Sequence, residues 1–167
     1  MKAKRPTVIT CTFPNICPIS SLNEGISKGH YTGVDGIDIS RRRVRLSPID
    51  KRGGKKIHII CFPLSSSELW YIPQIESLIA ANGKRFCKNA PHYLLGLMAT
   101  LPEEKMPSVL AFKSILGAEP DNPASIWPNR YGLPSFLCIR RYGDRRAGLA
   151  VVGGMWTSGY AFLTEDA

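Results

Sequence analysis

Lysine and arginine gather in two short segments of the chain, and their type and spacing suit the binding of anions. The first segment holds eight cations within sixteen residues: Arg41, Arg42, Arg43, Arg45, Lys51, Arg52, Lys55 and Lys56. Cations this close repel one another, and an anionic partner such as a phosphate backbone relieves that repulsion. The alternative interpretation is a solvated edge strand, where lysine and arginine discourage aggregation.

The second basic segment surrounds an aromatic residue and consists of Arg140, Arg141, Tyr142, Arg145 and Arg146. Guanidinium groups bind phosphates, and a tyrosine ring can stack on a base. A solvated turn, with Asp144 as an internal counter-ion, is again the alternative. We predict that these thirteen residues bind nucleic acid, most strongly if the fold brings both segments to one face.

The net charge of +9 is concentrated in the first third of the chain. Residues 1–56 carry twelve Lys and Arg against four acids, whereas residues 57–139 carry six of each sign. A local excess of positive charge is what a polyanion site requires.

The sequence shows no clear pattern of metal ligands or of a catalytic nucleophile. The histidines His30, His58 and His92 show no metal-binding spacing, and Cys87 with His92 lacks a second half-site. Cations near Cys87 favour its thiolate, but inert thiols are far commoner. The sequence therefore predicts no metal, no cofactor and no catalytic residue.

Five cysteines, an odd number without regular spacing, indicate reduced thiols and a cytoplasmic location. The beginning of the sequence has only a short apolar run, interrupted by Thr10 and Thr12, before Pro14. We therefore expect neither a signal peptide nor a membrane span.

Hydrophobic periodicity and turn residues predict strands at both ends of the chain and helices in the middle. The first strand, Thr7–Phe13, ends at Pro14, and an irregular connection follows to Gly36. A β-hairpin then joins the runs 37–39 and 44–46 to the strand Ile57–Phe62 through a basic tip. The expected helices are Pro73–Asn82 capped by Gly83, Pro91–Thr100 and Pro107–Leu116, and an antiparallel meander follows over Ser135–Arg141, Ala147–Val152 and Met155–Leu163.

Strands, then helices, then strands predict an α+β fold, in which about three short helices pack on one face of an antiparallel sheet of hairpins. The length of 167 residues and the hydrophobic share of 44% suit a single domain over residues 1–167.

Together these patterns favour a non-enzymatic protein that binds the phosphate backbone of RNA or DNA, alone or within a ribonucleoprotein. The alternative is a small interaction module or inhibitor, of the kind encoded by phages and mobile elements, that acts on a nucleic-acid-processing or defence complex. A third interpretation is an enzyme whose active site joins residues that are distant in sequence.

Overall fold

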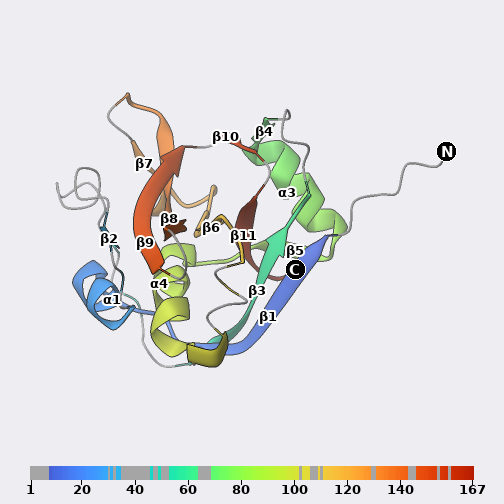
Figure 1. Cartoon of the computed structure of the whole chain (residues 1–167). Helices are drawn as coiled ribbons and strands as arrows, with labels where there is room; N and C mark the ends of the chain where they lie inside the picture. Colours follow the sequence, from blue (N-terminus) through green and yellow to red (C-terminus); the bar gives the residue numbers. More distant parts are fainter. Residues whose placement is uncertain are drawn as a thin grey trace.

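The computed structural model describes residues 8–29, 31, 33–34, 46, 49, 53–63, 69–101, 103–105, 109, 111–128, 131–142, 146–153, 155–157 and 159–167. Within these residues the chain forms two β-sheets and three α-helices (Figure 1). None of the helices described is long and apolar enough to cross a membrane.

A nine-stranded sheet organises the described part of the structure. Its main path runs through β1 (Ile9–Ile16), β3 (Lys55–Cys61), β11 (Tyr160–Asp166), β6 (Ser114–Leu116), β8 (Pro134–Tyr142), β9 (Arg146–Gly153) and β2 (Gly33–Val34). Off this path, β5 (Lys84–Phe86) pairs with β11, and β7 (Trp127–Pro128) pairs with β8. The β11–β6 and β2–β9 pairs are parallel, and the other described pairs are antiparallel.

Smaller elements complete the described structure. The strands β4 (Trp70–Tyr71) and β10 (Met155–Trp156) form a separate two-stranded antiparallel sheet. The α-helices are α1 (Leu22–Lys28), α3 (Ile72–Ala81) and α4 (Ala90–Thr100), and the 3-10 helices are η1 (Glu103–Lys105) and η2 (Pro123–Ser125). Three helices with a mostly antiparallel sheet confirm the predicted α+β class.

The strand β1 continues through Pro14, where the sequence predicted that it would end. Its pairing with β3 shifts register between Phe13 and Ile16, so Pro14 lies in an irregular part of the ladder. β1 is also the first strand of the described sheet path and has no described partner on its outer side. A proline is tolerated at an edge or a bulge because no ladder bond requires its missing N–H.

The predicted basic hairpin is wrong in its second arm. On one side β3 pairs with β1, from Lys55 opposite Ile16 to Cys61 opposite Ile9. On the other side β3 pairs with β11. Both edges of β3 are therefore occupied by strands from distant parts of the chain. Apart from Leu46, the predicted first arm lies outside the described residues, as do residues 47, 48 and 50–52 of the tip.

The predicted meander is correct for its first two strands. β8 and β9 pair antiparallel from Ser135 opposite Gly153 to Tyr142 opposite Arg146. The third strand is instead divided into β10, which pairs with β4, and β11, which lies between β3 and β6. β11 is buried on both faces, which suits an interior strand better than the edge of a meander.

Two of the three predicted helices are confirmed. α3 begins one residue before the expected Pro73, and Gly83 adopts a positive φ of 69° just beyond its end. α4 matches the second prediction to within one residue. The third prediction is wrong over Ser114–Leu116, which form β6 between β11 and β8.

A short helix lies in the segment expected to be irregular. α1 begins after Ser21, whose side chain accepts a hydrogen bond from the Glu24 backbone N–H at 3.2 Å. Lys28 Nζ lies 2.8 Å from Glu24 Oε1 one turn away. A serine cap and an i,i+4 pair of opposite charges are standard signals of a helix, so α1 could have been predicted from the sequence.

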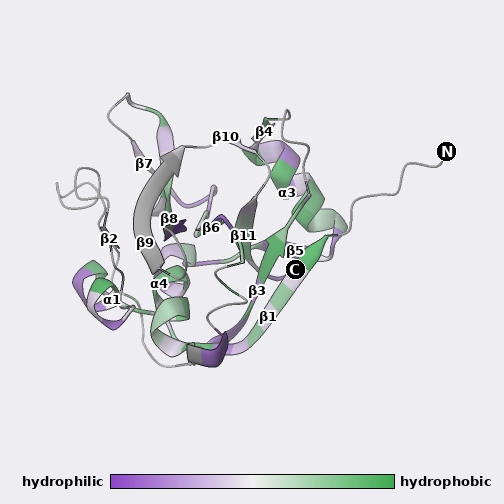
Figure 2. Ribbon diagram, viewed as in Figure 1, coloured by the Kyte–Doolittle hydropathy of each residue, from purple (hydrophilic) through white to green (hydrophobic). Residues whose placement is uncertain are grey.

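The helices cover both faces of the sheet, not one as predicted. Side chains alternate along β3, so Ile57 and Ile59 join a core that contains α4, while Ile60 joins a second core that contains α3. In Figure 1 α3 and α4 lie at different sides of the molecule. Figure 2 shows apolar residues along β1, β3 and α4.

Candidate polyanion-binding site

Three strand ends place charged side chains together at one end of the sheet. Lys55 and Lys56 begin β3, Lys84 and Arg85 begin β5, and Glu165 and Asp166 end β11. In the antiparallel β11–β5 pair, Arg85 lies opposite Glu165 and Lys84 opposite Asp166. Since neighbouring residues of a strand face opposite sides, Glu165 and Asp166 each collect cations on a different face of the sheet.

Glu165 is the buried centre of the first group, with a side chain that is only 10% exposed. Its carboxylate contacts Lys55 Nζ and accepts hydrogen bonds from Arg85 Nε at 2.9 Å and from the Lys88 backbone N–H at 3.1 Å. Burial is the largest single effect and raises the pKa of Glu165, but the hydrogen bond and charge of Lys55, together with the hydrogen bonds from the Lys88 N–H and Arg85, outweigh it, so the pKa lies below its usual value. The anionic carboxylate is therefore stable in this position.

Lys55 is held from several sides. Its ammonium donates to the Lys88 carbonyl at 2.8 Å and lies 4.3 Å from the centre of the Tyr93 ring on α4. This contact places the ammonium within cation–π range of the aromatic face. Lys55 is thus fixed by the fold, and its side chain is only 28% exposed.

Asp166 gathers the second group on the opposite face. Its carboxylate lies 2.9 Å from Lys56 Nζ, 3.3 Å from Lys84 Nζ and 2.9 Å from His58 Nε2. The hydrogen bond from Lys56 is the main cause that lowers the pKa of Asp166 to about 2. The carboxylate is ionised at neutral pH and partly neutralises the surrounding cations.

We call the five cations Lys55, Lys56, Lys84, Arg85 and Lys88 the basic cluster. Lys55, Lys56, Lys84 and Arg85 form ion pairs with two carboxylates, Glu165 and Asp166, so the group of five carries a surplus of three positive charges. The side chains of Lys56 and Arg85 are 54% and 51% exposed, and Lys88 is also exposed. These exposed cations can bind a further anion without breaking the contacts that Lys55 makes with Glu165 in the interior.

Three members of the basic cluster come from a part of the chain that charge counts did not single out. Lys84, Arg85 and Lys88 belong to a segment whose charges balance, yet they lie beside Lys55 and Lys56 of the predicted site. The remaining members of the first predicted segment, Arg41, Arg42, Arg43, Arg45, Lys51 and Arg52, lie outside the described residues.

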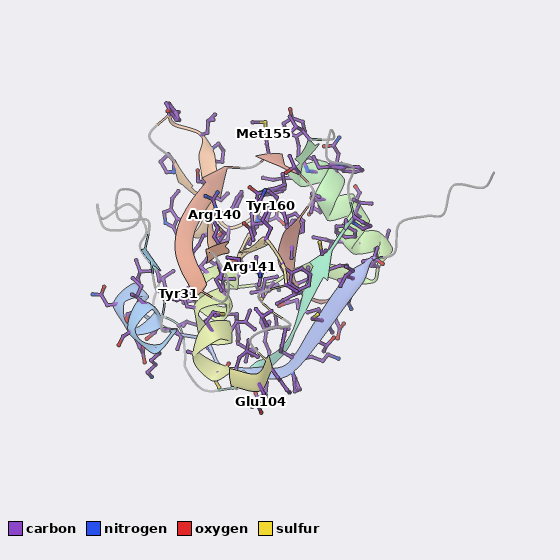
Figure 3. The ribbon with its side chains drawn as sticks, viewed as in Figure 1. Tyr31, Glu104, Arg140, Arg141, Met155 and Tyr160 are labelled. Carbon is purple, nitrogen blue, oxygen red and sulfur yellow. The ribbon has the colours of Figure 1, made fainter. Side chains whose placement is uncertain are left out.

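The second predicted segment lies at the other end of the sheet. In register, Tyr160 of β11, Ser114 of β6 and Arg140 of β8 form one row across three strands, while Asp166 and the basic cluster lie at the far end of β11. Figure 3 shows Arg140, Arg141 and Tyr160 between β9 and β11. Tyr142 and Arg146 form the last pair of the β8–β9 hairpin, and Arg145 lies outside the described residues. Lys55 and Lys56 are therefore not brought together with Arg140 and Arg141.

Cys87 lies next to the basic cluster but is buried. Burial is the dominant effect and raises the pKa of its thiol to about 12, although the Lys55 charge acts in the opposite direction. The thiol is therefore protonated at neutral pH, as expected for an inert cysteine. Across the described residues no group of three or more His, Cys, Asp or Glu side chains is placed to hold a metal ion.

A hydrogen-bonded row accompanies Asp166 and was not predicted. His58 joins Thr12 on β1 to Asp166 on β11, with its Nδ1 2.8 Å from Thr12 Oγ1. In the sequence, His58 lies in an apolar strand and shows no metal-binding spacing. Its two partners are 46 and 108 residues away, so local patterns gave no signal for them.

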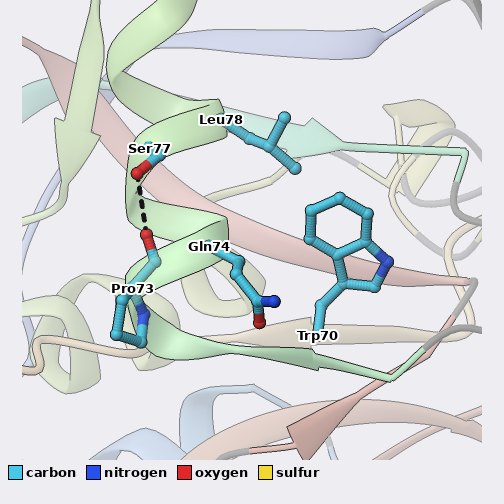
Figure 4. Close-up of a pocket in the computed structure, with 5 residues that line it drawn as sticks. All are labelled: Trp70, Pro73, Gln74, Ser77 and Leu78. Carbon is cyan, nitrogen blue, oxygen red and sulfur yellow. Dashed lines mark hydrogen bonds between the residues drawn. The ribbon is translucent and has the colours of Figure 1, made fainter.

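A shallow apolar hollow lies on α3 (Figure 4). Trp70, Pro73, Gln74, Ser77 and Leu78 line it. The Ser77 hydroxyl donates to the Pro73 carbonyl at 2.9 Å, so it already has a partner within the helix. The hollow has no titratable side chain in its lining and provides a contact surface, not a reactive site.

Comparison with known proteins adds no relative: no family model, no curated protein and no solved structure matches the chain.

Proposed function

We propose that the protein binds the phosphate backbone of RNA or DNA through the basic cluster. The observation that carries this proposal is that four cations from β3 and β5 pair with only two carboxylates, while a fifth exposed cation, Lys88, is joined to them through its backbone N–H. Phosphates would add at the exposed side chains of the cluster, Arg85 and Lys88 beside Glu165 and Lys56 beside Asp166 on the other face, and release counterions from the nucleic acid. The affinity is then electrostatic and depends little on base sequence.

The surroundings of the cluster support a preformed site. Glu165 fixes Arg85 and the Lys88 backbone, and Asp166 fixes Lys56 and Lys84. Side chains that are already held lose less conformational entropy when a ligand binds. The five cysteines are all free thiols, which supports a cytoplasmic location as part of this proposal.

The test compares two triple variants with the same loss of charge. K56Q/R85Q/K88Q removes the exposed part of the basic cluster, and K28Q/K105Q/K113Q removes three exposed cations from α1, η1 and the residue before β6. Fluorescence anisotropy against single-stranded and duplex RNA and DNA gives the affinity at several salt concentrations. For about four to six phosphate contacts, the log–log salt slope of the parent is expected to be about −3 to −5.

The cluster variant is expected to bind at least tenfold more weakly than the control, with a salt slope shallower by about two to three, because each lost phosphate contact changes the slope by about one. Equal binding by the two variants would mean that net charge alone is responsible. If the parent binds no polyanion, the proposal fails, and a protein partner for the cationic surface becomes the better explanation.

A further inference from the structure

The Thr12, His58 and Asp166 side chains form one hydrogen-bonded chain across the sheet. Thr12 on β1 lies directly opposite His58 on β3, and Thr12 Oγ1 is 2.8 Å from His58 Nδ1. On the other side of the ring, His58 Nε2 is 2.9 Å from Asp166 Oδ1. We propose that this chain is a catalytic site, in which Thr12 is a nucleophile for acyl transfer from an activated ester or thioester.

The hydrogen-bond directions assign the role of each group. An ionised carboxylate can only accept, so Asp166 requires the ring proton of His58 to be on Nε2. Nδ1 then has a free lone pair and accepts the hydrogen bond from the Thr12 hydroxyl. A nucleophile, a base in hydrogen-bond contact with it, and a third group that orients the base are the parts that activated hydroxyl nucleophiles share. Asp166 acts here as the positioning residue.

The electrostatic surroundings of His58 keep it in the form that accepts a proton. Its side chain is 7% exposed. Burial is the largest effect and lowers the pKa of His58 below 6.5, and the Lys84 charge lowers it further. Asp166 opposes this and Lys56 adds to it, so the charged groups facing the ring are two lysines and one carboxylate. At neutral pH the ring is therefore uncharged and available as a general base.

Thr12 is exposed to solvent, whereas His58 is buried. Thr12 lies on β1, the strand that has no described partner on its outer side. An unpaired strand edge presents backbone N–H groups outward at alternate residues, and such groups stabilise the oxyanion of an acyl-transfer intermediate. Lys56 and Lys84 both form ion pairs with Asp166 and so lie next to the hydrogen-bonded residues. Their positive charge favours substrates whose acyl group carries a carboxylate.

The reaction has two balanced steps. The Thr12 oxygen attacks the carbonyl carbon while its proton moves to His58 Nδ1, and the leaving alcohol or thiol departs with that proton, which leaves an ester on Thr12. Water then attacks this ester, again giving a proton to Nδ1, and the Thr12 oxygen takes that proton back as the acid is released. No oxidant, metal or cofactor takes part in either step.

The experiment uses the full chain and two probes, p-nitrophenyl acetate and the monoester of succinate with p-nitrophenol. We expect rapid release of about one p-nitrophenolate per protein, an acyl group on the peptide that contains Thr12, and faster reaction with the succinate ester. Thr12→Ala should abolish acylation of that peptide, and Thr12→Ser should retain it. His58→Gln should slow the acylation about a hundredfold or more, the usual effect of a general base.

Thr10→Ala is the matched control, because Thr10 is also exposed on β1 but lies opposite Ile60. It should acylate at the rate of the parent. The rate should rise with pH to a plateau with a midpoint below 6.5, and Asp166→Asn should move that midpoint lower, because Asp166 raises the pKa of His58. If the probes acylate only lysines, or if Thr12→Ala and Thr10→Ala react alike, the proposal is wrong and the chain only holds β1 against β3.

Discussion

At the scale of single residues, the two carboxylates at the end of β11 have different surroundings although they are neighbours in sequence. Glu165 is nearly buried and carries the contacts of Lys55, Arg85 and the Lys88 backbone, whereas the Asp166 side chain is 54% exposed. Ion pairs in water contribute little to stability, but a buried cation left without its partner is costly.

We therefore expect Glu165→Gln to destabilise the protein by about 2–4 kcal/mol, because Lys55 keeps its charge in a half-buried position. Asp166→Asn is the control and should have a much smaller effect, since its carboxylate is exposed. Urea denaturation followed by circular dichroism measures both. Equal effects would show that burial does not distinguish the two carboxylates.

His58 predicts how stability depends on pH. Its pKa is lower in the folded protein than its usual 6.5, so the unfolded chain binds more protons in the interval between the two values. Stability is therefore complete above about 6.5 and falls as the pH drops toward the folded-state pKa. The melting temperature of the parent should fall between pH 7.5 and pH 5.5, and it should fall less in His58→Gln. Glu165 and Asp166 do not account for a change in this interval, because their pKa values are lowered and they take up protons only at more acidic pH. Parallel declines would exclude His58 as the cause.

Part of the candidate site could be predicted at this scale and part could not. Lys55 and Lys56 stand out in the sequence because they belong to a run of cations. Their partners do not, since Lys55 and Glu165 are 110 residues apart and meet only because β3 pairs with β11. Charge counts along the chain find cations but not the sheet pairing that groups them.

At the scale of elements, α4 packs unusually closely against the segment that follows β1. A Cβ atom added at Gly96 would lie 1.9 Å from the Cys17 carbonyl oxygen, a backbone atom that a rotamer change cannot move away. The glycine in this helix is therefore required by the approach of another backbone, as is common where an element interior contains glycine.

Gly96→Ala should destabilise the protein by about 2 kcal/mol or more, although alanine is the better helix former by about 1 kcal/mol. Gly83→Ala is the comparison, because its added Cβ meets nothing within 4 Å and only the positive φ of 69° is unfavourable. That variant should cost about 1 kcal/mol. The midpoints of urea denaturation rank the two, and a stabilised Gly96→Ala would contradict the close contact.

The elements also show where sequence patterns stop being informative. α3 and α4 were predictable because each combines apolar spacing with a proline in its first turn. β6 was not, because Ser114, Ile115 and Leu116 are all buried and a fully buried strand has no polar alternation to distinguish it from a helix. The division of the last predicted strand into β10 and β11 likewise depends on tertiary pairing.

At the scale of the whole molecule, β11 connects the two cores. Ala161 and Leu163 face the core that contains α4, and Phe162 faces the core that contains α3. The strand pairs with β3, β5 and β6, so its backbone is bonded on both sides over most of its length. Opening β11 requires both cores to open.

Native-state hydrogen exchange should therefore be slowest for amides of β11 and its neighbour β3, with opening free energies close to that of global unfolding. The amides of α1 should exchange faster, because this helix is short and has only Gly25 fully buried. Mass spectrometry of peptides from both regions measures the contrast. Protection of α1 equal to that of β11 would contradict a central role for the strand.

The position of β11 also has a consequence for how the chain is made in the cell. β1 and β3 are synthesised early, but the strand that separates β3 from β6 is synthesised only after residue 160. In a nascent chain the edge of β3 from His58 to Cys61 therefore has no partner until β11 has been translated. Strand edges of this kind bind other chains. Chaperone protection during translation matters more for this topology than for one whose central strand is made first.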